Sequence, residues 1–170
     1  LAVLSGGELG LGTLGFYLVG YLFTNVGAFL VVQAVQQGGG DDSIDSFAGL
    51  VRRSGWLSFC MLVFLLSLAG IPFVVGFWAK LFVFVAAWQA GHAGLVVLAA
   101  VLSVVGLFYY LRVARAMFMV KAPDGAPPVR VELLTNVGIG LCLAAVVGMG
   151  VYPRPFVDAA LGAAQAYFGG

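Results

Sequence analysis

Charged residues are scarce in this chain. Only 9% of its 170 residues are charged, whereas 62% are hydrophobic, and the mean hydropathy is +1.09. Soluble domains are about 45 to 50% apolar, so this composition argues against a water-soluble fold. The 8 basic and 7 acidic residues leave a net charge of +1, which gives no electrostatic case for binding nucleic acid.

Residues that bind metals or redox groups are equally few. Cys60 and Cys142 are the two cysteines, each in an apolar segment, and His92 is the single histidine. This spacing provides neither a metal site nor a disulfide framework, and the sequence has no motif for flavin, haem or an iron–sulfur cluster. The closely spaced glycines of residues 138–150 follow no strand, which favours close helix packing over dinucleotide binding.

Long apolar segments are abundant instead. Crossing a hydrocarbon core of about 30 Å takes about 20 apolar residues in a helix. The spans that we expect, all within a single membrane region of residues 1–170, are about 12–37, 56–90, 94–119 and 133–152, with polar loops at 38–43 and 123–128. The fold class is therefore an all-α polytopic membrane protein with about four crossings. Because the sequence begins at Leu1 and has no leader pattern, we expect it to be a fragment of a longer protein.

The second segment is too long for one straight crossing. As a continuous helix, residues 56–90 would extend about 52 Å, so they form either two crossings or one interrupted crossing. Cytoplasmic loops carry an excess of Lys and Arg. The basic residues near the ends of the spans are Arg52, Arg53, Arg112, Arg115, Lys121 and Arg130. Only a single interrupted crossing places all of them on the cytoplasmic side, with the amino end and the carboxyl tail outside.

Gly70, Pro72 and Gly76 locate the interruption. Glycine has a low helix preference, and proline lacks the amide that the preceding turn needs. We expect the helix to break within residues 70–76 and the backbone to stay irregular for several residues near Lys80. Inside a membrane, such backbone persists only where protein or a water-filled cavity satisfies its polar groups. The break therefore also predicts hydration.

Lys80 is the only charged residue deep within a predicted span. A lysine at the centre of a membrane helix costs about 2.5 to 3.5 kcal/mol on insertion scales, so it is rarely there without a partner or a function. We interpret Lys80 as a proton relay; the alternative is a structural lysine whose amine reaches the outer end near Ala90. His92, in the short link after this span, is either a solvated loop histidine or a proton exit.

The residues around the break resemble a known membrane-protein signature. Two runs are similar to that of the antiporter-like membrane subunits of respiratory complex I: Ser67-Leu68-Ala69-Gly70-Ile71-Pro72 and Gly76-Phe77-Trp78-Ala79-Lys80-Leu81-Phe82. Supporting matches are Gly27-Ala28-Phe29, Gly49-Leu50 and Tyr109-Tyr110-Leu111-Arg112. In the resembled family, subunit M usually has Glu at the position of Lys80, and subunit L has an acidic pair at Leu81 and Phe82. Both differences favour the branch called subunit N of NADH-quinone oxidoreductase, or subunit 2 in mitochondria.

This resemblance implies a role in proton translocation. The four spans would be the last four of a 14-helix subunit, and the second would be the discontinuous helix of its carboxyl-terminal half-channel. Lys80 would belong to a chain of buried ionisable residues and water that exports protons when quinone is reduced elsewhere in the complex. The partners would be other complex I membrane subunits, especially antiporter-like ones, and the lipid of a bacterial inner membrane, with no nucleic acid.

The resemblance also implies where the redox chemistry takes place. The enzyme would be the whole proton-pumping NADH:quinone oxidoreductase, to which this chain would contribute no cofactor and no metal site. FMN, iron–sulfur clusters and quinone are expected in partner subunits. The alternatives are a subunit of a related cation/proton antiporter or membrane hydrogenase, and a structural membrane scaffold in which Lys80 has no part in transport.

Overall fold

The computed structural model describes residues 1–41, 43–123 and 125–168. Asp42 and Asp124, in the two polar loops, and residues 169–170 lie outside the described residues. The described part of the chain is helical and contains no strand, which confirms the all-α expectation. The elements are α1 (Ala2–Ser5), α2 (Gly7–Gln37), the short 3-10 helix η1 (Ile44–Phe47), α3 (Leu50–Arg53), α4 (Gly55–Ala69), α5 (Val75–Gln89), α6 (Ala93–Met119), α7 (Leu133–Val151) and α8 (Arg154–Phe168).

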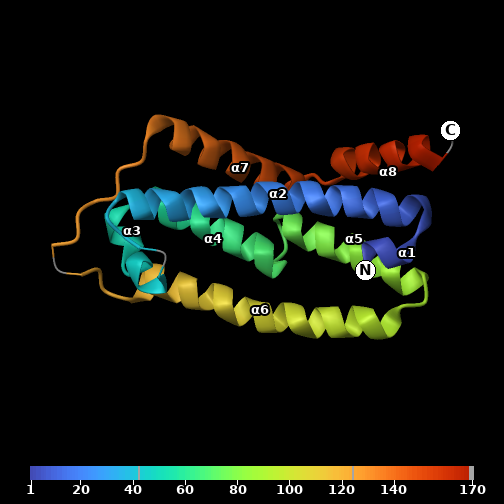
Figure 1. The fold of residues 1–170 in the computed structure, drawn as a ribbon, viewed down its shortest axis with the longest axis horizontal. Coiled ribbons are helices and arrows are strands. Elements are labelled where there is room, and N and C mark those ends of the chain that lie inside the picture. The colour runs from blue at the N-terminus through green and yellow to red at the C-terminus, as the bar shows by residue number, and fades with distance from the viewer. Residues whose placement is uncertain (42, 124, 169–170) are drawn as a thin grey trace.

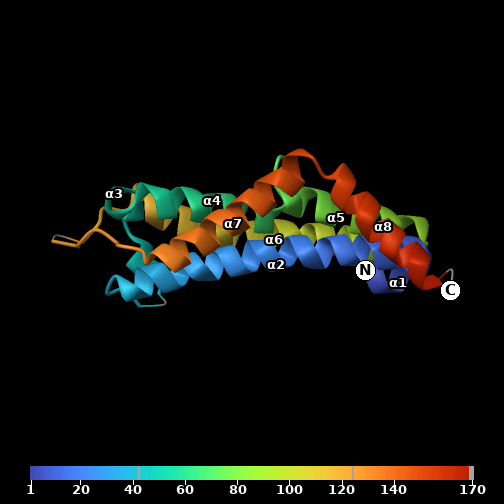
Figure 2. The ribbon, with the colours of Figure 1, turned by 90° about the horizontal axis from the view of Figure 1, so that it is seen from above.

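The long helix α2 runs the length of the molecule and forms its centre (Figure 1). Helices α4 and α5 lie end to end along one side of α2, and α6 lies beyond them (Figure 1). Helices α7 and α8 also follow each other along α2, on another side, as the turned view shows (Figure 2). Two continuous helices, α2 and α6, are thus combined with two pairs of half-length helices.

Within the described part of the chain, three helices are individually long and apolar enough to cross a membrane, namely α2, α6 and α7. Helices α4 and α5 are apolar too, but each has 15 residues, or about 22 Å of helix, which is shorter than a hydrocarbon core. Placed end to end, the two helices follow most of the length of α2 (Figure 1). The pair therefore makes one crossing, which confirms the prediction of a discontinuous second helix.

The break between α4 and α5 begins at Gly70. This residue has a φ of 84°, a left-handed conformation that glycine adopts without the steric cost of a Cβ atom. Its backbone N–H donates to the carbonyls of Leu66 and Ser67, both at 3.0 Å, and so closes the last turn of α4. Pro72 then prevents the helix from continuing, and Phe73 has a φ of 78° before α5 begins. The predicted break at Gly70 and Pro72 is therefore confirmed.

The break is shorter than the sequence predicted. We expected irregular backbone through residues 70–76 and toward Lys80, but α5 is a regular helix from Val75 onward. Gly76 lies in the first turn of α5, where its backbone N–H donates to Ser67 Oγ at 3.2 Å. A side chain at Gly76 would overlap the Ser67 carbonyl. This glycine therefore allows the two helix ends to approach closely, and the Ser67 hydroxyl satisfies an amide that has no partner within α5.

The carboxyl-terminal segment contains a helix that we did not predict from the sequence. Helix α7 occupies most of the predicted fourth span, and the residues beyond it, which we expected only as a tail outside the membrane, form α8. The helix is interrupted next to Pro153, which lacks a backbone amide. On α2, Gly12 lies against Leu161 of α8, and Gly15 lies near Ala160. Helix α8 therefore packs along the half of α2 that α7 leaves uncovered.

Residues 38–53 and 120–132 meet at one end of the bundle, which we call the loop end (Figure 1). The Gly49 N–H donates to the Ala116 carbonyl at 3.0 Å, and the Val129 N–H donates to the Arg53 carbonyl at 3.3 Å. The Arg53 side chain also donates from Nε to the Pro127 carbonyl at 3.2 Å. The link at residues 90–92 and both chain ends lie toward the opposite end, the turn end (Figure 1). This arrangement agrees with the single crossing predicted from the positions of the basic residues.

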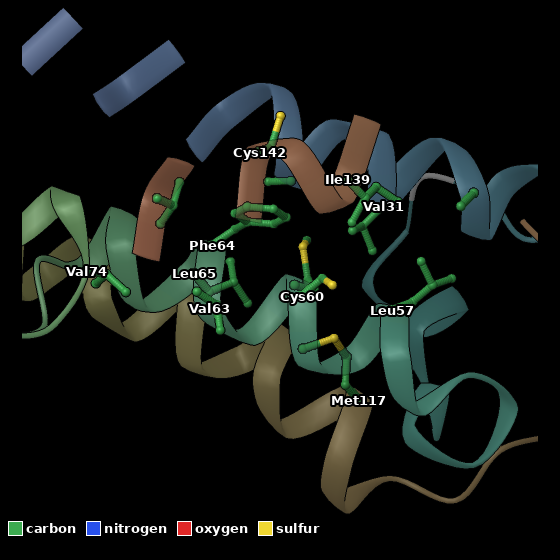
Figure 3. Packing of buried hydrophobic residues seen from close by; sticks show 14 of the residues in the cluster. Val31, Leu57, Cys60, Val63, Phe64, Leu65, Val74, Met117, Ile139 and Cys142 are labelled. Atoms are coloured by element: carbon green, nitrogen blue, oxygen red, sulfur yellow. The ribbon is translucent and has the colours of Figure 1, made fainter. Parts of the chain in front are cut away.

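The main hydrophobic core lies in the half of the molecule near the loop end (Figure 3). Phe64 of α4 is fully buried between α2 and α7, and its ring fills the space beside Gly27. Cys60 and Cys142 are free and buried among these apolar side chains, as expected for packing residues (Figure 3). This core fixes α4 against α2 and α7, so the end of α4 is held rigidly at the break.

Candidate functional site

Lys80 reaches back from α5 to the end of α4. Its Nζ donates to the Leu68 carbonyl at 2.8 Å and to the Ala69 carbonyl at 3.2 Å. These carbonyls belong to the last turn of α4, where the helix ends and they have no partner further along it. The carboxyl end of a helix carries partial negative charge, so it favours a cation. These two carbonyls hold the amine of Lys80 at a defined place, and no carboxylate among the described residues bonds to it.

A cavity of about 360 Å³ opens beside Lys80, between α2, the end of α4, α5 and α6. Hydroxyl groups from several helices contribute to its lining, so water there would find hydrogen-bond partners. The hydroxyl-bearing residues of the lining are Tyr17, Tyr21, Thr24, Ser67, Ser103 and Tyr110. A volume of this size accommodates several water molecules. Hydration at the break stays a prediction, for which this cavity offers room and hydrogen-bonding groups.

Lys80 also lines a second cavity, of about 320 Å³. The two cavities share Tyr17, Lys80 and Ser103 in their linings. The second cavity continues along Val83 and Phe84 of α5, which follow Lys80 toward the turn end. Lys80 thus lies between a cavity at the helix break with many hydroxyl groups and a second cavity with fewer, which leads toward the turn end.

A chain of buried hydrogen bonds joins three helices next to Lys80. The Thr24 hydroxyl donates to the Gly20 carbonyl within α2 at 2.7 Å. Because a hydroxyl has one hydrogen, the Ser67 hydroxyl is the donor in its 3.1 Å contact with Thr24. Ser67 Oγ in turn accepts from the Gly76 N–H at the start of α5. Ser67 and Thr24 are each 1% exposed, so these three bonds lie in the protein interior.

Of the predicted site residues, the glycines of the break lie beside Lys80, whereas His92 lies away from it. Gly70 lies in contact with the aliphatic part of Lys80, and Gly76 lines the first cavity with it. His92 lies 12 residues beyond Lys80, about 18 Å along the helix direction, and the linings of the two Lys80 cavities do not include it among the described residues. The role of His92 as a proton exit therefore stays a prediction without a visible connection to Lys80.

Asp41 lies in the loop after α2 and is not part of the Lys80 site. Hydrogen bonds from Ser43 and Ser46 lower the pKa of Asp41 to about 2. Its carboxyl group therefore stays ionised at any physiological pH and serves as an acceptor that orders the loop.

Sequence reasoning missed the hydroxyl network. Ser67 is part of the run that carries the family resemblance, but its side-chain contacts with Thr24 and Gly76 join residues distant in the sequence. Hydroxyl residues are common in membrane helices and often bond within their own helix, as Thr13 and Ser103 do here. The one available signal is the coincidence of Ser67 with the predicted break, where backbone amides lose their helical partners.

These features define the class of the protein: an all-helical polytopic membrane protein in which a lysine faces hydroxyl-lined cavities at a broken helix. Residues 1–106 match the family described as "NADH:quinone oxidoreductase/Mrp antiporter, TM". The chain belongs to this family.

Named relatives agree with the branch that the sequence favoured. NADH-quinone oxidoreductase subunit N of Moorella thermoacetica is 36% identical over 168 residues, covering 99% of this chain and 35% of that relative. Subunit N 1 of Roseiflexus castenholzii is 41% identical over 145 residues, covering 85% of this chain and 27% of the relative. The chain therefore spans about a third of the length of the curated relatives that it matches.

Solved structures show the same fold. A chain of respiratory complex I from Thermus thermophilus with bound aureothin is similar with a TM-score of 0.75 and 28% identity, over 89% of this chain and 35% of that chain. A chain of the Mrp complex from Dietzia sp. DQ12-45-1b has a TM-score of 0.79 and 21% identity, over 97% of this chain and 39% of the other. The second likeness concerns the fold alone. Both matched chains come from structures of complexes.

Proposed function

We propose that this chain forms part of a proton-translocating subunit of NADH-quinone oxidoreductase, with Lys80 as its proton-exchanging group. The observation that carries the proposal is the position of Lys80 between two cavities, with its Nζ bonded to the free carbonyls of Leu68 and Ala69. A neutral amine retains hydrogen atoms for these bonds, whereas an ammonium gains from the helix dipole. Lys80 can therefore lose and regain a proton while it stays bound to α4.

The driving reaction lies outside this chain in the proposal. Quinone reduction in partner subunits, which would hold FMN and iron–sulfur clusters, supplies the free energy, and this chain provides part of the proton path in a bacterial inner membrane. The partners are the other membrane subunits of the complex, in particular the antiporter-like ones. The relatives named as subunit N and the likeness to a chain of complex I support this assignment.

The test compares Lys80→Arg with Lys80→Met in the full-length subunit within its assembled complex. Arginine keeps the positive charge and the hydrogen-bond donors that satisfy α4, but it does not release its proton in proteins. We expect both variants to lose most of the proton translocation per complex, while Lys80→Arg assembles in near-normal amounts. Proton uptake by vesicles and quinone-linked turnover, each divided by the amount of complex, provide the measurement.

The structural scaffold hypothesis gives a different result. If Lys80 only holds the end of α4, Lys80→Arg preserves both assembly and proton translocation, and the proposed function is wrong. Membership of a family that includes Mrp antiporters favours cation/proton exchange as the second candidate. In that case, transport by the wild-type complex depends on a gradient of sodium or another cation and needs no NADH oxidation.

A further inference from the structure

The amine of Lys80 bonds to the last turn of α4, and this turn is itself bonded to α2. The carbonyls that bind Nζ belong to the two residues immediately after Ser67. Ser67 is the last residue of α4 with a side-chain bond to another helix among those described, through its contact with Thr24. The apolar core holds the body of α4, and the Ser67–Thr24 contact is the described hydrogen bond that joins its last turn, and so the acceptor carbonyls, to α2.

The backbone that follows Ser67 adds no further described hydrogen bond to α2. The amides of Gly70 and Ile71 both donate to the Leu66 carbonyl at 3.0 Å, which closes the turn of α4 but makes no bond to a neighbouring helix. After this turn, Phe73 has a positive φ and its side chain is 80% exposed. The Ser67–Thr24 contact lies on the opposite, buried side and faces the first cavity.

On this basis we propose that Thr24 is a positioning residue for Lys80. Its hydroxyl accepts from Ser67, holds the last turn of α4 against α2, and so fixes the Leu68 and Ala69 carbonyls where the Lys80 amine binds them. Thr24 does not contact Lys80 through any bond described here; it acts through Ser67. The inference rests on the proposed function of Lys80 and names a residue on another helix that supports it.

Thr13 provides a matched control within the same helix. Thr13 and Thr24 are both buried threonines of α2, at 5% and 1% exposure. The hydroxyl of Thr13 donates to the carbonyls of Leu9 at 2.8 Å and Gly10 at 3.1 Å, so its described bonds stay within α2. Replacement of either threonine by valine keeps the branched shape and removes one hydroxyl. The two variants therefore differ in the loss of the contact between helices.

The experiment uses Thr24→Val, Thr24→Ser, Thr13→Val and Lys80→Arg in the full-length subunit of the assembled complex. Proton translocation per complex is measured as a function of pH. We expect Thr24→Val to lower translocation about three- to tenfold and to change the pH profile, whereas Thr24→Ser retains the profile of the wild type. Tyr17, Tyr21 and Tyr110 are the other titratable groups that line the first cavity, and every variant keeps them.

The outcomes separate the two proposals. If Lys80→Arg impairs translocation and Thr24→Val behaves like Thr13→Val, the positioning role of Thr24 is overturned and the function of Lys80 stands. If Thr24→Ser is as impaired as Thr24→Val, the hydroxyl is not responsible and the positioning role is again overturned. If Lys80→Arg translocates protons normally, the proposed function itself fails. Division by the amount of complex removes any effect of the variants on assembly.

Discussion

Gly148 and Gly150 lie two residues apart near the end of α7, yet their surroundings differ. A Cβ atom at Gly148 would meet nothing within 4 Å. A Cβ atom at Gly150 would overlap the backbone of Phe73 and Val74 in the break between α4 and α5. The Gly150 carbonyl also accepts from Trp78 Nε1 at 2.8 Å. Gly150 therefore lets the end of α7 lie directly against the broken helix.

Alanine substitution at these two glycines should have opposite effects on stability. Gly150→Ala forces the backbone of α7 away from Val74, and such overpacking costs about 1 to 3 kcal/mol. Gly148→Ala adds a methyl group to open space and improves helix propensity by up to about 1 kcal/mol. The melting temperature of the purified complex should fall for Gly150→Ala and stay equal or rise for Gly148→Ala. Equal melting temperatures would contradict the close approach at Gly150.

At the residue scale, the sequence predicts an unusual charge or a helix break more reliably than it predicts which side chains touch. Lys80 could be found because a charge in an apolar span is costly, whatever its neighbours are. The expected close packing of the glycines in residues 138–150 holds for Gly138 and Gly150, but Gly140 and Gly148 face open space. The contact between Thr24 and Ser67 was not predictable because it depends on how α2 and α4 face each other.

Two broken helices meet at the middle of the molecule. The break between α4 and α5 lies beside the end of α7, where α7 gives way to α8 (Figure 2). Trp78 in the second turn of α5 bridges them, because its indole N–H donates to the Gly150 carbonyl. This carbonyl lies at the end of α7, where helical acceptors lack partners. Trp78 thus holds the start of α5 against α7, and Ser67 holds it against α4.

Replacement of Trp78 by phenylalanine tests this connection between elements. Trp78→Phe keeps an aromatic ring but leaves the Gly150 carbonyl without its donor, which costs about 1 to 3 kcal/mol for a buried acceptor. Trp88→Phe is the control, because Trp88 lies in the same helix and its side chain is 58% exposed. Thermal unfolding should begin at a lower temperature for Trp78→Phe only. Equal destabilisation by both variants would show that the indole N–H has no special role.

The two breaks were not equally visible in the sequence. Gly70 and Pro72 interrupt an apolar segment that is too long for one crossing, so both the break and its position could be predicted. At Pro153 the apolar segment already had the length of one span, and Arg154 and Asp158 made the residues beyond it resemble a tail. The helical spacing of the apolar side chains in α8 predicts a helix there, but we relied on the length of the apolar segment and on the charged residues beyond it.

The whole molecule exposes apolar side chains along much of α6. Those with more than half of their surface exposed include Val97, Leu98, Val101, Leu102, Val104, Val105, Phe108 and Tyr109. In water such a surface would be unfavourable, whereas in a membrane it can face lipid or other helices. The exposed face of α6 thus agrees with the membrane composition of the sequence and with relatives that are subunits of larger complexes.

The topology of the whole molecule can be tested by labelling from the two sides of the membrane. Ser43 and Pro128 are exposed at the loop end, and Gly94 is exposed at the turn end. A membrane-impermeant maleimide should label Ser43→Cys and Pro128→Cys from the cytoplasmic side and Gly94→Cys from the opposite side, because the loop end carries the basic residues. The native thiols of Cys60 and Cys142 are buried and provide the unlabelled background.

This labelling distinguishes one crossing from two for residues 56–90. If α4 and α5 each crossed the membrane, the loops containing Ser43 and Pro128 would be accessible from opposite sides. The bonds between the two loops, such as that of the Val129 N–H with the Arg53 carbonyl, could then not form. Because α4 and α5 are each too short for the hydrocarbon core, a double crossing would also leave both helix ends at the break without water or protein partners. Labelling of both loops from the same side is therefore the result that the lengths of the helices, the loop contacts and the basic residues jointly require.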